Sequence, residues 1–260
     1  MKPGTQVMIK DFLVREFQKD SAYLFPLRLF IGVGWMRASL EKFMEAGWQD
    51  GSSLMAFFDR QIAGHHVAFP FYRALIQDQF ASHGLALSWI IMIGQLLVGM
   101  SILVGLLTNF ALLCGLFMNF NFIFAGEVTP SAFYIVIQTA LFISNAGAVI
   151  GIDQFLSRKI AICLLVAQPD GGRRSTWVDK ASFLTLAILS LGAGLFALPY
   201  IRDFSPHSVD DPAMILLVLS IVIGLSAFIT LLRFQKKTGL KDLTSSPSSS
   251  SDPRFRHGQD

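Results

Sequence analysis

The most restrictive feature of the sequence is a stretch of 48 residues, from Gln79 to Gly126, without a single Asp, Glu, Lys or Arg. A helix crosses the hydrocarbon core of a bilayer in about 20 residues, so this stretch is long enough for two crossings. Of the 260 residues, 53% are hydrophobic and only 15% are charged, against about 25% charged in ordinary soluble domains. We therefore exclude a soluble globular protein, a disordered chain and a nucleic-acid-binding protein.

Apolar runs of about 20 residues predict an all-α integral membrane protein with six spans. Backbone N–H and C=O groups in lipid must form hydrogen bonds within the chain, which only helices and closed β-barrels achieve. No segment alternates between apolar and polar residues as barrel strands do, so the spans are predicted to be helices. The second, third and fourth runs are joined by short turns and should pack as antiparallel neighbours. Glycines in the second run, among them Gly94 and Gly99, permit close helix approach. The six predicted spans are 22–43, 85–107, 110–126, 131–150, 182–201 and 213–233.

The distribution of Lys and Arg predicts the orientation of the spans, because the cytoplasmic loops of membrane proteins are enriched in these residues. With the N-terminus inside, the cytoplasmic segments hold fifteen Lys and Arg residues and the outside loops hold three. The three outside residues are Arg60, Arg73 and Arg202. We therefore expect both termini in the cytoplasm, which is an N-in/C-in topology.

The segments between and beyond the spans divide the chain further. Residues 1–20 carry seven charges and no cleavable signal, so we expect a cytoplasmic N-terminal segment. The length and apolar clusters of 50–84 predict one or two short interfacial helices that form an outside cap. Residues 156–234 combine a short apolar stretch at the inner surface with the last two spans. The Ser- and Pro-rich residues 235–260 are expected to be a disordered cytoplasmic tail.

The first span is unusual because it contains four charged residues, Arg28, Arg37, Glu41 and Lys42. A basic residue at the centre of a membrane helix costs about 2.5–3.5 kcal/mol, so each needs an explanation. Helical spacing puts Arg28 and Lys42 on one stripe and Arg37 on the opposite face, where Glu41 is placed to pair with it. Two explanations stay open. In the first, the long side chains reach the membrane interfaces and Arg37 and Glu41 form a structural ion pair. In the second, the charged residues bind an anion or a quinone head group. A deep arginine should face protein, which makes Arg28 the first candidate.

Amide side chains in the following spans form a second set of candidates. Amide side chains in membrane helices commonly form hydrogen bonds between helices. In this chain they could instead line a small cavity together with Arg28, and both interpretations stay open. Asn119 and Asn121 diverge by about 200° on a helix, so we expect at most one of them to face a given site. Glu127, at the outer end of the third span, is expected to be solvated. The amide residues are Gln95, Asn119, Asn121, Gln138 and Asn145.

Several kinds of cofactor site are excluded by the sequence. All five histidines lie outside the predicted spans, so a haem held by two histidines inside the bundle has no ligands. The two cysteines, Cys114 and Cys163, lie far apart in apolar surroundings and are expected to be buried thiols. No dinucleotide-binding glycine motif, phosphate-binding loop or zinc-protease motif is present. We predict no metal site and no covalently bound cofactor.

Four segments resemble the DoxX/DoxD family of membrane proteins, in the order in which the family has them. RLFIGVGWMRASLEKF matches the opening helix of the family through Arg28, Gly32 and Lys42. GQLLVGMSILVGLLTNFALLCGLFMNFNFIFAG matches the second and third spans, including the GLLTN turn between them. SNAGAVIGID resembles the Asn- and Gly-rich end of the fourth span and the Gly-x-Asp that follows it. The resemblance covers about residues 20–155 and implies a four-helix transmembrane core over 21–155, with the last two spans as additions.

The chain departs from the family pattern at two positions. Gln95 stands where the family often has an acidic residue, and Asn109 stands where the turn usually has a basic residue. An activity that depends on either of those charges is therefore put in doubt.

The resemblance implies a redox function. One branch of the family supplies the small membrane subunit of thiosulfate:quinone oxidoreductase, and other branches belong to oxidant-defence assemblies. We therefore expect a redox-complex subunit of the bacterial cytoplasmic membrane that passes electrons from a sulfur donor or a partner protein to membrane quinone. In this reading Arg28 contacts an anion or the quinone head group, and Lys42 and Glu41 lie near the outer mouth.

Two alternatives to the redox function stay open. One is a non-catalytic scaffold or assembly subunit of a larger membrane complex, and the other is a small-solute permease. The sequence therefore leaves open whether the protein is an enzyme.

Overall fold

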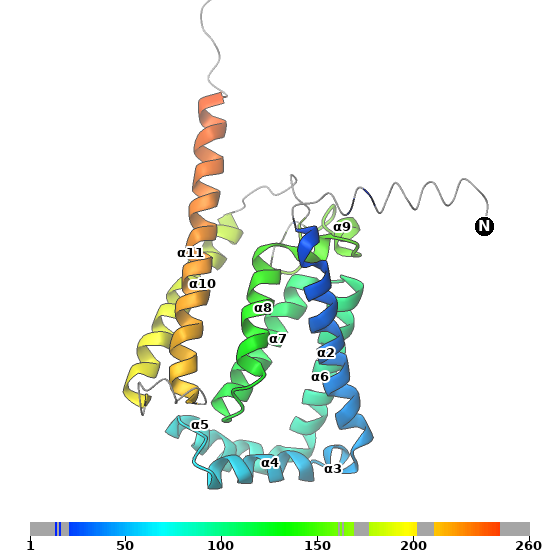
Figure 1. The fold of residues 1–260 in the computed structure, drawn as a ribbon, viewed down its shortest axis with the longest axis vertical. Helices are drawn as coiled ribbons and strands as arrows, with labels where there is room; N and C mark the ends of the chain where they lie inside the picture. The colour runs from blue at the N-terminus through cyan, green and yellow to red at the C-terminus, as the bar shows by residue number, and fades with distance from the viewer. Residues whose placement is uncertain are drawn as a thin grey trace, which may run out of the picture.

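The computed structural model describes Val14, Glu16, residues 21–160, Ile162, and residues 164–168, 177–201 and 211–244. Within these ranges the regular structure is helical throughout and contains no strand, so the predicted all-α class is confirmed. The long helices run roughly parallel to one another, with short helices at both ends (Figure 1). The long helices are α2 (Phe25–Met44), α6 (Gly84–Val104), α7 (Thr108–Phe124), α8 (Ser131–Ile143), α10 (Trp177–Ala197) and α11 (Pro212–Thr244).

Short helices connect the long ones at the two ends of the bundle. The connection from α2 to α6 carries most of them, and the segment after α8 carries two more. The short helices are η1 (Ala22–Leu24), α3 (Ala46–Gln49), α4 (Ser52–Ala63), α5 (Pro70–Leu75), η2 (Ile76–Phe80), η3 (Ala81–His83), η4 (Ala146–Ala148), α9 (Asp153–Leu156) and η5 (Leu198–Tyr200).

Three helical segments are long and apolar enough to cross a membrane, namely Pro70–Val104, Phe183–Tyr200 and Pro212–Leu231. Two further apolar helices, α7 and α8, are shorter, with 17 and 13 residues. The 20-residue helix α2 is long enough to cross but carries the four charges singled out in the sequence. These lengths and compositions fit a protein that contacts the lipid bilayer.

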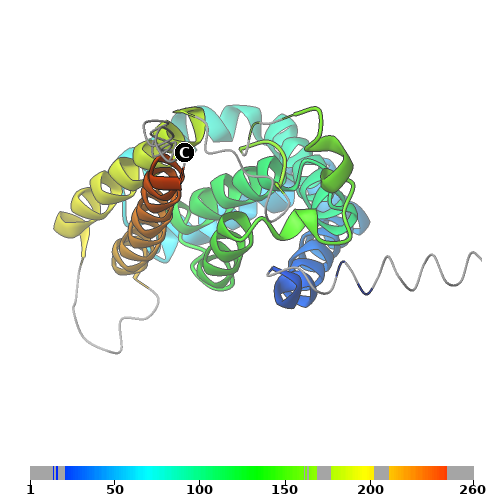
Figure 2. The same ribbon diagram turned by 90° about the horizontal axis from the view of Figure 1, so that it is seen from above.

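The helices pack as two neighbouring pairs, α2 with α6 and α7 with α8, and α11 adds the α10–α11 hairpin to the side of α8 (Figures 1 and 2). The α2–α6 contact is close because both helices present glycine. A Cβ added to Gly99 would lie 2.8 Å from the backbone nitrogen of Met36 and 3.0 Å from the carbonyl oxygen of Gly32. Ser39 Oγ also donates a hydrogen bond to the Met92 carbonyl across this contact, at 2.7 Å.

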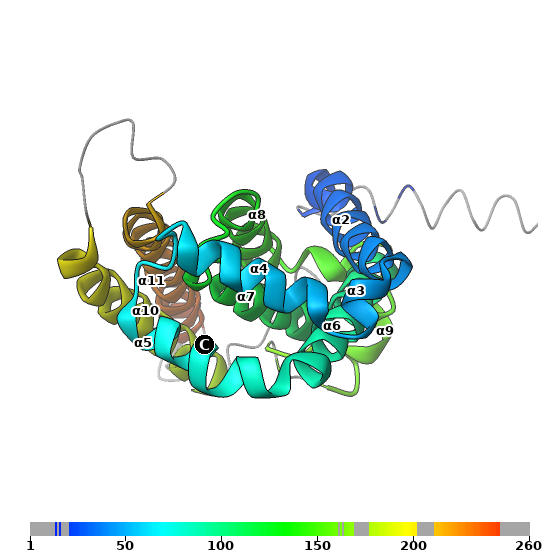
Figure 3. The same cartoon turned by 90° about the horizontal axis from the view of Figure 1, so that it is seen from below.

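The connection from α2 to α6 forms a layer across one end of the bundle, where α4 crosses below α6 and α7 (Figure 3). The segment expected to hold one or two short helices, 50–84, contains four, namely α4, α5, η2 and η3. Phe69 fixes this layer, because its fully buried ring contacts Phe124 at the end of α7, Phe196 at the end of α10 and Tyr200 in η5. The layer therefore packs against the core and against the last two helices.

Two predicted spans end earlier than expected. The span over 85–107 ends as a helix at Val104, because Gly105 takes a left-handed conformation (φ 70°) that terminates α6. The span over 131–150 ends at Ile143, because Asn145 is also left-handed (φ 53°) and the chain turns into η4. Conversely, α11 continues through Thr244, past the expected start of the tail at 235, and residues 245–260 lie outside the described residues.

The glycine contact between α2 and α6 predicts a specific loss of stability. Gly99→Leu should lower the free energy of unfolding by about 1–3 kcal/mol, because its side chain meets the backbone of α2, which cannot move aside. Gly192→Leu, in α10, is the control, because an added Cβ there meets nothing within 4 Å. Thermal unfolding of both variants in mild detergent measures the difference, and equal midpoints would contradict the packing.

Candidate functional site

Arg28 is fully buried near the start of α2, and its guanidinium binds the chain that follows α8. Nη1 donates to the carbonyl oxygens of Ala146 (2.9 Å) and Val149 (2.6 Å), and Nη2 donates to that of Ile150 (3.1 Å). The charge also lies 4.9 Å from the centre of the Phe25 ring. These three carbonyls belong to η4 and the chain after it, and their oxygens are the acceptors that a buried guanidinium needs.

Asp153 binds the turn between α6 and α7 from the same loop. Its Oδ1 accepts the N–H of Leu107 at 2.7 Å, and its Oδ2 accepts the N–H of Thr108 at 2.9 Å. The Asp153 N–H in turn donates to the Gly105 carbonyl at 2.7 Å. Burial raises the pKa of this carboxyl, and the surrounding N–H groups oppose the shift. A carboxylate at the N-terminus of α7 is also favoured by the helix dipole.

Asn145 completes this arrangement, which we call the Arg28 cluster: Arg28, Asn145 and Asp153 with the backbone of 105–109 and 146–151. Asn145 Oδ1 accepts hydrogen bonds from Asn109 Nδ2 (3.2 Å) and from the Gln168 N–H (3.3 Å). Gly105 is required here, since a Cβ added to it would lie 2.6 Å from the Gly151 Cα. The segments that carried the family resemblance, the start of α2, the GLLTN turn and SNAGAVIGID, therefore meet in one cluster.

A cavity of about 1,000 Å³ lies farther along the bundle, between the α2–α6 and α7–α8 pairs and beneath α4. Its walls are mainly apolar side chains, with contributions from α2, α4, α6, α7 and the start of α8. Lys42 and Glu127 are the two charged residues among the described residues that line it. A large apolar cavity with few polar groups is typical of a binding site for a small, largely apolar molecule.

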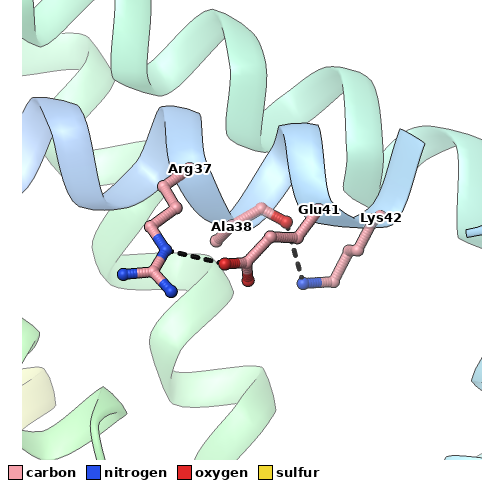
Figure 4. Close-up of polar contacts among 4 residues, drawn as sticks. All are labelled: Arg37, Ala38, Glu41 and Lys42. Atoms are coloured by element: carbon pink, nitrogen blue, oxygen red, sulfur yellow. Dashed lines mark hydrogen bonds and ion pairs between the residues drawn. The ribbon is translucent and has the colours of Figure 1, made fainter. Parts of the chain in front are cut away.

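The predicted site residues divide between these two places and the surface. Arg28 and Asn145 belong to the Arg28 cluster, whereas Lys42, Gln95, Asn119 and Asn121 line the cavity. Arg37 and Glu41 lie exposed on α2, where Arg37 Nε donates to Glu41 Oε1 at 2.6 Å, as the spacing predicted (Figure 4). The cavity thus gathers four of the nine candidates, and Gln138 lies behind its wall, where it accepts a hydrogen bond from Asn119.

Asn119 and Asn121 both line this large cavity, although they bind side chains of different helices, as their divergence on α7 predicts. The cavity is wide enough to extend around α7, from the α6 side to the α5 side. Asn119 Nδ2 donates to Gln138 Oε1 at 3.0 Å, and Asn121 Oδ1 accepts the Tyr72 hydroxyl at 3.1 Å. Tyr72 was not a candidate in the sequence, because nothing in 50–84 indicates which side chains turn inwards.

Polar atoms without partners mark the middle of the cavity wall. Trp35 and Gln95 both line the cavity and are 2% exposed. Trp35 Nε1 and Gln95 Oε1 are buried and make no hydrogen bond with the described residues. Such unpaired groups are rare in folded proteins, and others in this structure, such as Gln138 Nε2 and Thr139 Oγ1, lie outside the cavity lining.

The end of the cavity next to α3 and α4 carries its two charges, Lys42 and Glu127. Lys42 Nζ lies 4.9 Å from the centre of the Trp48 ring and donates to the Ala38 carbonyl at 3.2 Å (Figure 4). Glu127 follows α7 and is half-buried, not solvated as expected. Burial raises the pKa of the Glu127 carboxyl, and the charge of the nearby His66 lowers it in part.

The cavity reaches the outside of the bundle between α6 and α7. Ile90, Leu97 and Phe117 line it and are also largely exposed, by 66%, 58% and 70%. Cys114, expected to be a buried thiol, lies half-buried in the same wall, and Cys163 lies outside the described residues. An opening bordered by exposed apolar side chains admits a molecule that is dissolved in lipid.

Compared with family models, with curated proteins and with solved structures, the chain matches none of them. The resemblance to the DoxX/DoxD family therefore remains an expectation from the motifs.

The Arg28 cluster predicts different effects for two arginines of the same helix. Arg28→Met should lower the free energy of unfolding by about 3 kcal/mol or more, because three buried carbonyls lose a charged donor. Arg37→Met should leave it unchanged, because the Arg37–Glu41 pair is exposed. Chemical denaturation in mild detergent compares the two variants. Equal losses, or a loss confined to Arg37→Met, would show that the Arg28 contacts do not stabilise the fold.

Proposed function

We propose that this protein is a six-span membrane protein of the DoxX kind whose four-helix core, α2, α6, α7 and α8, binds membrane quinone in the cavity. In this role it serves as the quinone-binding subunit of a redox complex of the bacterial cytoplasmic membrane. Electrons come from a sulfur donor or a partner protein, and they leave on the quinone. The chain's own part is to bind the quinone ring and to exclude water from it.

The observation that carries this proposal is the cavity and its opening. Its volume of about 1,000 Å³ lies at the upper end of the range for small-molecule sites. Its opening is bordered by the exposed side chains Ile90, Leu97 and Phe117. A quinone is an apolar ring with two oxygens and an apolar tail, so it can enter from the bilayer while its oxygens meet the few polar groups of the wall.

The arrangement of the helices supports the proposed orientation. The N-terminal end of α2 and the C-terminal end of α11 lie at the same end of the bundle, opposite α3, α4 and α5 (Figure 1). Both ends lie next to the segments rich in Lys and Arg, which favour the cytoplasm. The layer of short helices then covers the outer end of the cavity, and the Arg28 cluster closes the inner end.

The proposal assigns different roles to the residues that the sequence singled out. The guanidinium of Arg28 is engaged with backbone carbonyls, so its role is to hold the core together. Trp35, Gln95 and Asn119 in the cavity wall take over the contacts to the quinone oxygens. Lys42 remains at the outer mouth, as the family resemblance implied.

Filling part of the cavity should weaken quinone binding without unfolding the protein. Gly94 lines the cavity, and a Cβ added there makes only ordinary contact with Met118, at 3.6 Å, so Gly94→Leu has room. Its affinity for a short-chain benzoquinone should fall by about tenfold or more. Gly192→Leu, with open space around the added group, should bind as the unmodified protein does.

Equilibrium titration of the purified proteins in mild detergent makes this comparison. If the unmodified protein does not bind the quinone, or if Gly94→Leu binds it equally well, the proposed site is wrong. A protein that binds no quinone but co-purifies with a stable membrane partner would instead support the scaffold alternative.

A further inference from the structure

The charge of Arg37 lies level with the central part of α6. Gly99 of α6 lies against the backbone of α2 at Met36, and Ser39 donates to the Met92 carbonyl. Arg37 lies between these two contacts. With 21 residues, α6 is about 30 Å long, which matches the thickness of the hydrocarbon core of a bilayer. Arg37 therefore lies deep in the membrane when α6 spans it.

Arg37 and its partner Glu41 point away from α6 and are open on the outside of the bundle. Ser39 faces α6 through its hydrogen bond to Met92, and Arg37 lies about 200° around α2 from Ser39. Arg37 Nε donates to Glu41 Oε1, one turn farther along the same side of the helix (Figure 4). The two side chains are 78% and 61% exposed. Charged groups inside a membrane are costly and face protein or a water-filled cavity, so this ion pair calls for a cover.

The exposed residues around the pair recur at the spacing of a seam between two parallel helices. Such a seam alternates steps of three and four residues along each helix. On α2 the exposed residues with this spacing are Phe30, Val33, Arg37, Leu40 and Met44. We call these five residues the α2 seam. Its apolar members suit lipid as well as protein, whereas Arg37 does not suit lipid.

The charges on this side of α2 are complementary to themselves. Two copies of the chain in one membrane share one orientation, so a two-fold axis along the membrane normal lays α2 parallel to α2 of the second copy. Equal residues then meet at the same level, and Arg37 of each copy lies about 6 Å along the axis from Glu41 of the other. Long side chains reach across this distance. Two arginines and two glutamates then form a set without excess charge.

We propose that the α2 seam is the contact between two copies of this chain in the membrane, with Arg37 of each copy paired to Glu41 of the other. The contact removes both ion pairs from lipid and gives each charge a second partner of opposite sign. It does not depend on the quinone site, whose opening lies between α6 and α7.

Disulfide cross-linking in membranes tests this contact, because water reaches the ion pair once detergent replaces the bilayer. The full chain carries Cys114→Ser and Cys163→Ser, and Val33→Cys adds one cysteine to the α2 seam. The Cα atoms of a disulfide lie within about 7 Å of each other, so oxidation should give a covalent dimer. Leu191→Cys is the matched control, since Leu191 is 66% exposed on α10, and it should stay monomeric.

An exchange of charges separates the ion pairs from the apolar contact. In chains that also carry Val33→Cys, Arg37→Glu leaves two negative charges beside the seam, and Glu41→Arg leaves two positive charges. Like copies repel, so cross-linking of either variant alone should fall about tenfold. Together in one membrane the two variants attract each other and should restore the cross-link. A thermal unfolding midpoint in mild detergent confirms that each variant is folded.

Four results would overturn this inference. The first is a Val33→Cys chain that cross-links no more than the Leu191→Cys control. The second is a single charge variant that cross-links as well as its parent, and the third is a mixture of the two variants that cross-links no better than each alone. The fourth is a Val33→Cys product whose mass shows a different protein, which would assign the α2 seam to another subunit.

Discussion

The hydrogen bonds from the buried Arg28 guanidinium to the carbonyls of Ala146, Val149 and Ile150 are the interaction on which the rest of the structure depends. They attach α2 to the chain that follows α8. Asp153, in the same segment, attaches that chain to the turn between α6 and α7. The helices α2, α6, α7 and α8 are thus fixed at one end. The guanidinium of Arg28 pairs with carbonyls of the chain after α8, and the carboxylate of Asp153 pairs with N–H groups at the start of α7, which a helix end otherwise leaves unpaired.

This fixed end explains how the four helices can enclose a cavity farther along the bundle. The α2–α6 pair is packed closely through Gly99, and the α7–α8 pair is joined by the Asn119–Gln138 hydrogen bond. Between the two pairs, apolar side chains line a space of about 1,000 Å³ that α4 covers. A wall that is mainly apolar with few polar side chains suits a small, largely apolar molecule.

Much of the helical architecture could be predicted from the sequence, because lipid leaves the chain few alternatives to helices. The end of α8 could not, because Asn145 takes its left-handed conformation only in contact with Asn109 and Gln168. Arg28 was singled out correctly as a buried charge, but a sequence does not show that its partners are backbone carbonyls. Likewise, helical angles separated Asn119 from Asn121, whereas only the packed structure shows a cavity wide enough to contact both.

Photolabelling with a light-activated benzoquinone tests most directly whether the cavity between the two helix pairs is a quinone site. After irradiation of the full chain in mild detergent, the account predicts cross-links in the cavity-lining parts of α2, α6 and α7, around Trp35, Gly94 and Met118. An excess of unlabelled quinol should suppress them. Cross-links confined to the exposed faces of α10 and α11, or labelling that quinol does not reduce, would contradict the account.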